Sequence, residues 1–243
     1  MLPMQDINPT RRFPIVNFIL IGINVVVFLW EMSLGERGLQ QAFQELAVVP
    51  ATFSPAPLSP ESLMDVLRSM FMHGSFEHIA GNMLYLYLFG DNIEDRFGIP
   101  LYLVLYFLSG YAAAFAQTLV DPSSTIPMVG ASGSIAGVLG AYLVLYPSVK
   151  VRGIIPLGRV SQMSEMPAVI VLGFWFVLQL FNGITSLGAA YQGGGGGVAF
   201  FAHIGGFVAG VALAFLFRML VPEHQSSTER NQTLYQRAQR YRW

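Results

Sequence analysis

Six long apolar segments restrict what this chain can fold into. Charged residues make up only 11% of its 243 residues, whereas soluble proteins average about 25%. Because about 20 consecutive apolar residues cross a bilayer as a helix, this pattern predicts a polytopic membrane protein. The six segments cover 14–30, 75–90 (with a continuation to about 96), 101–120, 132–146, 168–187 and 198–221.

The fourth segment, 132–146, is too short to cross a membrane completely. At 1.5 Å per residue it spans roughly 22 Å, and Pro147 ends it. We therefore expect an all-α membrane protein, a bundle of six transmembrane helices whose short fourth helix starts below the outer membrane surface.

The basic residues indicate the orientation of this bundle. With the N-terminus in the cytoplasm, only Arg37 and Arg68 of the 13 Lys and Arg residues fall on the outer side. Both termini are therefore expected in the cytoplasm. The expected parts are a cytoplasmic tail at 1–13, a membrane domain at 14–221 with an outer loop at 31–72, and a polar cytoplasmic tail at 222–243.

Composition also excludes several classes of function. The chain has no cysteine, which excludes disulfides, thiol catalysis and zinc sites with sulfur ligands. Its net charge of -1 gives no general attraction to nucleic acid. The lipid bilayer is the expected surrounding, with no nucleic acid partner and no cofactor.

Two loop regions are open to more than one interpretation. The stretch 63–72 is amphipathic and is typical of a short helix in the membrane interface. The run Gly193–Gly197 is flexible by composition, as a gate or as a simple linker.

Polar side chains converge at one depth of the predicted bundle. In the expected orientation the second, fourth and sixth segments all run from outside to inside. Ser132 begins the fourth, His78 and Asn82 lie in the first two turns of the second, and His203 lies near the start of the sixth. All four should therefore lie in the outer part of the membrane, where such residues usually face a bundle interior.

Ser132 and His203 form a candidate nucleophile and general base. A serine hydroxyl is a weak nucleophile until a base takes its proton. Alone, Ser132 is typical of a helix N-cap, and His203 of a hydrogen bond between helices. Their common depth and flanking glycines favour catalysis. No carboxylate is suitably placed beside His203, so we expect a two-residue catalyst whose histidine is oriented by packing.

His78 and Asn82 are four residues apart and share one helical face. They are candidate donors to an oxyanion, beside the free N–H groups at the start of the fourth helix. A structural polar clasp is the alternative. Gly130 and Gly133 would let a substrate backbone come close. Zinc bound by His73, His78 and His203 is a weaker rival, because no zinc-protease helix motif is present; no metal is expected.

These motifs resemble those of the rhomboid intramembrane serine proteases, in a bacterial type. The resemblance covers nearly the whole chain. The matching motifs are Gly130-Ala131-Ser132-Gly133, Ala202-His203-Ile204-Gly205-Gly206 followed by Gly210, the spacing of His73, His78 and Asn82, and the spacing of Gly90, Glu94 and Gly98.

The resemblance implies a serine endopeptidase that cleaves transmembrane segments of single-pass membrane proteins with a Ser–His dyad. It implies Ser132 as nucleophile, His203 as base, and an oxyanion hole formed by His78, Asn82 and the Ser132 N–H. Ala131, Gly133, His73, Gly206 and Gly210 would lie near the site. The implied location is a bacterial inner membrane, with the active site toward the outer face.

Two departures from the family pattern stand out. Many members have an aromatic residue four positions after the nucleophile, where this chain has Ala136, so another side chain must support His203. The Trp-Arg pair common in the first outer loop is also absent.

Two other classes of function remain open from the sequence. One is a catalytically silent relative that binds transmembrane clients, although such a protein would be expected to lack the serine or the histidine. The other is a six-helix transporter, although the chain shows no internal repeat.

Overall fold

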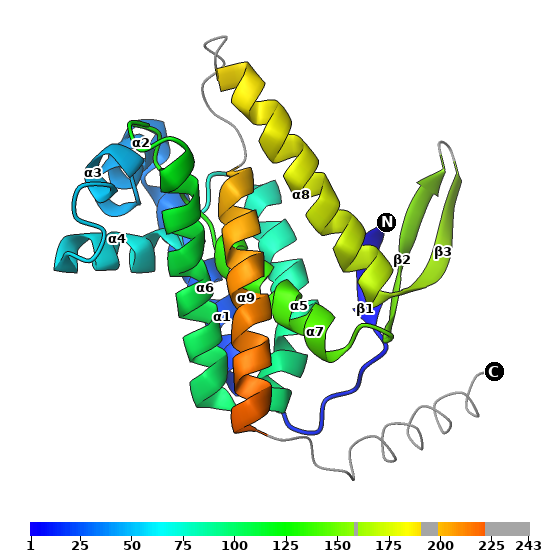
Figure 1. Cartoon of the computed structure of the whole chain (residues 1–243). Helices are drawn as coiled ribbons and strands as arrows, with labels where there is room; N and C mark the ends of the chain where they lie inside the picture. Colours follow the sequence, from blue (N-terminus) through cyan, green and yellow to red (C-terminus); the bar gives the residue numbers. More distant parts are fainter. Residues whose placement is uncertain (158–159, 191–198, 222–243) are drawn as a thin grey trace, which may run out of the picture.

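Each of the six expected apolar segments contains one helix. The computed structural model describes residues 1–157, 160–190 and 199–221. The helices agree with the expected segments to within a few residues at most ends (Figure 1). They are α1 (Ile15–Ser33), α5 (Phe76–Phe97), α6 (Ile99–Val120), α7 (Ser132–Leu145), α8 (Ala168–Ala190) and α9 (Phe200–Leu220).

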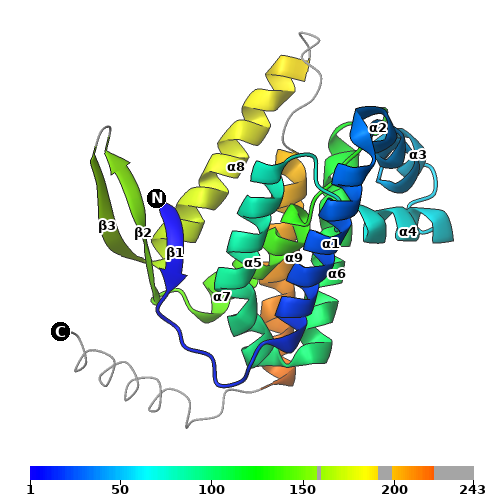
Figure 2. The same cartoon turned by 180° about the vertical axis from the view of Figure 1, so that it is seen from behind.

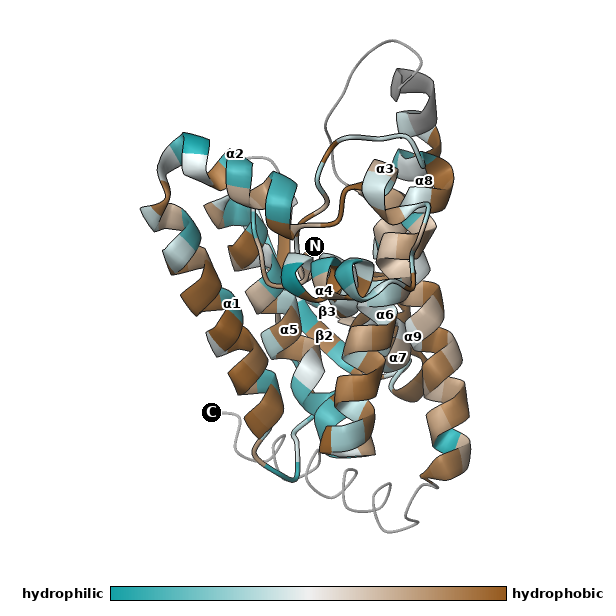
Figure 3. Cartoon of the chain, turned by 90° about the vertical axis from the view of Figure 1, so that its left-hand side faces the viewer, coloured by the Kyte–Doolittle hydropathy of each residue, from teal (hydrophilic) through white to brown (hydrophobic). Residues whose placement is uncertain are grey.

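Four of these helices, α1, α6, α8 and α9, are long and apolar enough to cross a membrane. Helix α7 has only 14 residues, and α5 is long but charged toward its C-terminal end. Figure 3 shows the hydrophobic colouring along α1, α6 and α9. The protein is therefore a mostly helical, integral membrane protein with several spans.

The loop between α1 and α5 contains three further helices, α2 (Gly35–Leu46), α3 (Pro50–Phe53) and α4 (Pro60–Ser69). They gather at one end of the bundle, and α2 and α4 are largely hydrophilic in Figure 3. Helix α4 corresponds to the predicted amphipathic helix and starts earlier, because Ser59 caps it and Pro60 opens it. The outer loop is thus built mainly of short helices.

This loop is bound to the segment that precedes α7. The N–H of Met128 donates to the carbonyl of Val48 at 2.7 Å, and the N–H of Gly130 donates to the carbonyl of Ser69 at 2.8 Å. These backbone bonds hold the outer loop against the start of α7 without a Trp-Arg pair.

A three-stranded antiparallel sheet, which was not expected, accompanies the mostly helical fold. Strand β1 (Leu2–Asp6) pairs with β2 (Lys150–Leu157), which pairs with β3 (Val160–Pro167) (Figure 2). Leu2 lies opposite Ile154 and Asp6 opposite Val151. Much of the expected N-terminal tail is therefore a strand. The β2–β3 stretch includes Val151, Ile154 and Ile155, which suit a strand, but its pattern was too short to separate it from a connecting loop.

The Gly90, Glu94 and Gly98 pattern has a structural basis. The Glu94 carboxylate accepts from the N–H groups of Val16 and Asn17, at 3.1 and 2.7 Å, so it caps the start of α1. Gly98 ends α5 with φ of 77°, a conformation that favours glycine. Glu94 therefore ties α5 to the start of α1, and Gly98 ends α5.

Helices α7 and α9 pack more closely than any other pair. A Cβ atom on Gly206 would collide with the carbonyl of Gly133, and one on Gly210 with the carbonyl of Gly137. We call these four residues the glycine seam. Without side chains the two backbones touch, which is how small residues bring helices together in a membrane.

Helix α8 is packed quite differently. It runs obliquely beside the other helices in Figures 1 and 2 and contacts mainly α9 and α7. In an 18-residue apolar stretch of α8 only 17% is buried inside the molecule, whereas 39% of the corresponding stretch of α6 is buried. The Gly193–Gly197 run that follows α8, and the predicted tail at 222–243, lie outside the described residues.

Candidate active site

Ser132 and His203 are in direct contact. Ser132 Oγ lies 2.8 Å from His203 Nε2, although 71 residues separate them in the chain. Ser132 is the first residue of α7, and His203 lies in the first turn of α9. The glycine seam begins one residue beyond Ser132, so the close approach of the two helices brings the hydroxyl to the imidazole.

The chain enters α7 through a conformation that favours glycine. Gly130 has φ of 128°, and a Cβ there would lie 2.7 Å from His78 Nε2. The N-cap residue Ala131 is completely buried and has no side chain able to cap the helix. The first N–H groups of α7 therefore lack acceptors within the helix and lie at the positive end of its dipole.

Three polar residues lie together near this turn, His73 just before α5 and His78 and Asn82 in its first two turns. Asn82 Nδ2 is 2.9 Å from His73 Nε2, and the rings of His73 and His78 are 5.0 Å apart, edge to face. The Ser75 hydroxyl oxygen accepts from the His78 N–H and caps α5. His78 adjoins Gly130, whereas Asn82 is bonded to His73.

The outer loop also contributes to this group. The buried carboxylate of Glu31, near the end of α1, accepts from the backbone N–H of His73 at 3.0 and 3.1 Å. This contact fixes the end of α1 to the segment that precedes α5.

Gly133 is closed in by neighbouring helices. A Cβ there would collide with the side chain of Ala113 in α6 and would lie 3.9 Å from the carbonyl of Ala202. The geometry supports a packing role for Gly133. Gly206 and Gly210 also take part in packing, through the glycine seam.

The sequence reasoning missed two residues of α8 that adjoin His203. Gln179 Oε1 lies 2.8 Å from His203 Nδ1, and the Trp175 ring is 5.9 Å from the imidazole ring, tilted by 37°. A long amide in the middle of an apolar segment was the available signal, since such groups in membranes usually have a partner. Nothing in the sequence paired Gln179 with His203 specifically.

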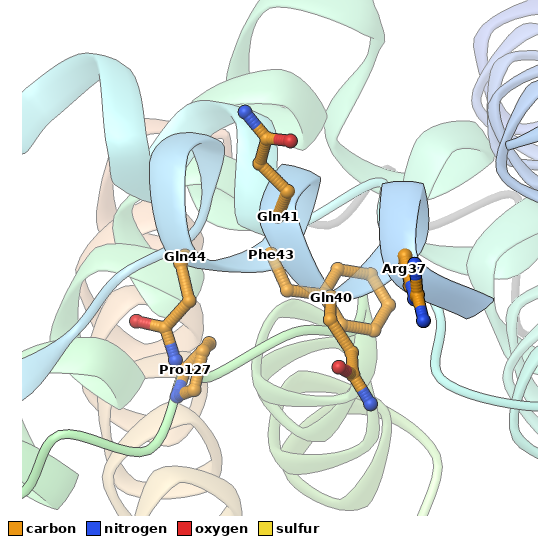
Figure 4. Close-up of a pocket in the computed structure, with 6 residues that line it drawn as sticks. All are labelled: Arg37, Gln40, Gln41, Phe43, Gln44 and Pro127. Carbon is orange, nitrogen blue, oxygen red and sulfur yellow. The ribbon is translucent and has the colours of Figure 1, made fainter.

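Metal-ligand clusters and surface pockets are the two other features that could form a site. Among the described ranges, no three His, Asp or Glu side chains converge as a metal site. A surface pocket lies on the outer loop, lined by α2 and Pro127 (Figure 4). Its residues provide no nucleophile beside a base. They are Arg37, Gln40, Gln41, Phe43, Gln44 and Pro127.

A serine hydroxyl bonded to an imidazole between apolar helices is typical of a membrane-embedded hydrolase. The Rhomboid domain family model matches residues 60–220, more than half of the chain. The chain belongs to the rhomboid family.

The chain is similar to rhomboid proteins from several organisms. Rhomboid protein 1, mitochondrial, of Saccharomyces cerevisiae is 30% identical over 139 residues, 55% of this chain and 37% of the relative. Rhomboid-like protease 3 of Toxoplasma gondii is 27% identical over 177 residues, 73% of this chain and 60% of the relative. Inactive rhomboid protein 1 of Drosophila melanogaster is 29% identical over 87 residues, 36% of this chain and 6% of the relative.

The matched region is thus 60% or less of the length of these relatives. Family membership supports an intramembrane protease-type function and a multi-pass membrane location. The relatives named here are eukaryotic, so the expected bacterial inner membrane rests on the sequence alone.

Proposed function

We propose that this protein is an intramembrane serine endopeptidase in which Ser132 is the nucleophile and His203 the general base. The observation that supports this most directly is the 2.8 Å contact between Ser132 Oγ and His203 Nε2. That distance suits proton transfer from a hydroxyl to an imidazole. Both residues lie in the two most closely packed helices, so their separation is set by the backbone.

The reaction proceeds in two halves. His203 Nε2 accepts the Ser132 proton as Oγ bonds to the scissile carbonyl carbon, which forms a tetrahedral oxyanion. The imidazolium then gives that proton to the leaving amine as the C–N bond breaks, leaving an acyl-serine. Water, deprotonated by the same imidazole, hydrolyses the ester and regenerates Ser132.

The oxyanion is stabilised at the start of α7. The Ser132 N–H lies at the positive end of the helix dipole, and His78 adjoins the turn at Gly130. Asn82 has two amide hydrogens, of which one is used toward His73, so the other remains for the oxyanion. A polar clasp and an oxyanion donor are thus compatible roles for Asn82.

The substrates we propose are transmembrane segments of single-pass membrane proteins. The dyad lies among apolar helices, so a substrate that reaches it from the lipid must itself be apolar. A helical amide is bonded within its own ladder and must unwind before attack, which favours helix-breaking residues near the cleaved bond.

We further propose that all six long helices belong to a membrane domain at 14–221, with residues 1–13 and 222–243 in the cytoplasm. The pairing of β1 with β2 supports this topology, because it requires the N-terminus and the α7–α8 connection to lie on the same side. Ser132 then faces the outer half of the bilayer, as the distribution of basic residues also favours.

The proposal is tested with purified protein in proteoliposomes and a panel of single-pass helices. We expect the wild type to cleave at least one helix, and Ser132→Ala and His203→Ala each to abolish cleavage with unchanged thermal unfolding. A silent binding protein would bind helices without cleaving any of them, and a transporter would cleave none. Cleavage that survives in Ser132→Ala would reject the assigned nucleophile.

A further inference from the structure

The second ring nitrogen of His203 has a partner on a different helix from the nucleophile. His203 Nε2 faces Ser132 Oγ at 2.8 Å, and Nδ1 faces Gln179 Oε1 at 2.8 Å. The three side chains come from α7, α9 and α8 and form one continuous chain of hydrogen bonds.

An amide oxygen opposite Nδ1 selects one form of the imidazole. The amide oxygen only accepts, so Nδ1 must carry the hydrogen. A neutral imidazole then has its lone pair on Nε2, toward Ser132, which is the form a general base requires. If the amide donated its NH2 group instead, the lone pair would lie on Nδ1 and Nε2 could not accept the serine proton.

Trp175 supports the same imidazole from the same helix. It precedes Gln179 by four residues, so both side chains leave one face of α8. Its ring lies 5.9 Å from the His203 ring and 6.2 Å from the Phe207 ring. Ala136, completely buried in α7, has no ring to offer at this place. Helix α8 therefore supplies both the hydrogen bond and the aromatic contact.

We propose that Gln179 is a positioning residue that fixes the tautomer and orientation of His203, with Trp175 packing beside the ring. This inference rests on the proposed peptidase function. It makes α8 part of the catalytic machinery, because the base is set in place only when α8 lies against α9.

The first test measures turnover in Gln179→Met, which keeps the length of the side chain and removes the acceptor. We expect kcat to fall on the order of 10- to 100-fold, by analogy with the loss of orienting partners of metal-binding histidines, with little change in KM. Gln179→Glu restores an acceptor and should recover most of kcat. Asn182→Leu is the matched control, because it removes an amide one turn further along α8 and should leave kcat unchanged.

The pH profile adds a signature that a structural role would not produce. In Gln179→Glu a carboxylate faces the imidazole and stabilises its protonated form, so the acid limb of the kcat profile should move to higher pH. His78 is the titratable neighbour whose charge also acts on His203, and it is unchanged in these variants.

A second measurement needs no turnover. Nitrogen-15 NMR of histidine-labelled protein, with His203→Ala for assignment, reports which ring nitrogen carries the hydrogen. We expect hydrogen on Nδ1 in the wild type and a mixture in Gln179→Met. Hydrogen on Nε2 in the wild type, or full kcat in Gln179→Met, would overturn the proposal. A wild type that cleaves nothing would reject the peptidase function, while the NMR result would still decide the role of Gln179.

Discussion

The glycine seam and α8 hold His203 from two sides in opposite ways. At the seam, the backbones of α7 and α9 touch, and no side chain can be added without collision. Helix α8 reaches the same imidazole through two long side chains, Gln179 and Trp175, and is the least buried of the four candidate spans. The seam thus sets the distance between the proposed nucleophile Ser132 and the proposed base His203, and in our proposal α8 sets the orientation of the His203 ring.

The largest expected effect comes from breaking the seam. In Gly206→Val the new side chain meets the Gly133 carbonyl, so α7 and α9 must separate. We expect a loss of stability of about 1–3 kcal/mol or more and a fall in cleavage of roughly 10²-fold. Thermal unfolding and proteoliposome cleavage measure the two effects.

Gly173→Val in α8 is the matched control, because nothing lies within 4 Å of a Cβ at Gly173. It should cost little in either measurement. Equal losses in the two variants would contradict the distinction between the seam and α8.

The second prediction concerns an engineered disulfide that would link α8 to α9. An ideal Cβ on Gly183 lies 3.4 Å from the Phe200 Cβ, close to the usual spacing across a disulfide, and the chain has no other cysteine. The disulfide in the oxidised double variant Gly183→Cys/Phe200→Cys would restrain α8. If α8 moves to admit a substrate helix, this variant should cleave the substrate several-fold more slowly than the wild type. Labelling of Ser132 by a small fluorophosphonate should stay unchanged.

Reduction should restore cleavage in that double variant, and each single-cysteine variant should behave the same with or without oxidant. Identical cleavage in the oxidised and reduced forms would mean that substrate entry needs no motion at this end of α8.

The third prediction concerns the aromatic contact. Trp175→Ala removes a ring interaction worth about 0.5–1.5 kcal/mol, so kcat should fall by roughly two- to tenfold. Phe174→Ala is the control, since the adjacent Phe174 side chain is 61% exposed. An equal fall in both variants would reduce Trp175 to a general contributor to α8 stability.

The smallest effect on cleavage is expected where α7 meets the sheet, because the effect there is on stability. Asp6 in β1 accepts from Tyr142 and Asn92, each at 2.9 Å. Burial and the charge of Asp91 raise the pKa of Asp6 to about 7. Folding therefore favours the protonated carboxyl, so this contribution to stability is present below about pH 4 and is lost as pH rises through about 7.

Comparing unfolding temperatures at pH 5 and pH 8 tests this sign. The wild type should lose stability toward pH 8, and Asp6→Asn should remove that part of the dependence. The same pH dependence in both proteins would show that Asp6 is not its source.

The sequence predicted the helices well, because apolar length and capping are local signals. Ser75, the N-cap of α5, and Pro100, in the first turn of α6, are examples of such local signals. The directions of the apolar segments predicted that Ser132 and His203 lie at one depth in the membrane, and in the structure the two side chains are in contact.

Other features depend on contacts between distant segments. The pairing of β1 with β2 joins residues about 150 positions apart. A local sequence pattern does not predict such a distant pairing. The expectation that packing rather than an acid orients His203 did not include the contact with Gln179, because the sequence around a single amide in an apolar helix does not indicate its partner. This chain has Ala136 where the family pattern has an aromatic residue, and the structure places Trp175 beside the His203 ring.

The central claim is that His203 activates Ser132 within the membrane domain. The most direct measurement is mass-spectrometric mapping of the residue modified by a fluorophosphonate in proteoliposomes. The account predicts modification of Ser132 in the wild type and its loss in His203→Ala. Modification at another residue, or equal modification of Ser132 without His203, would contradict it.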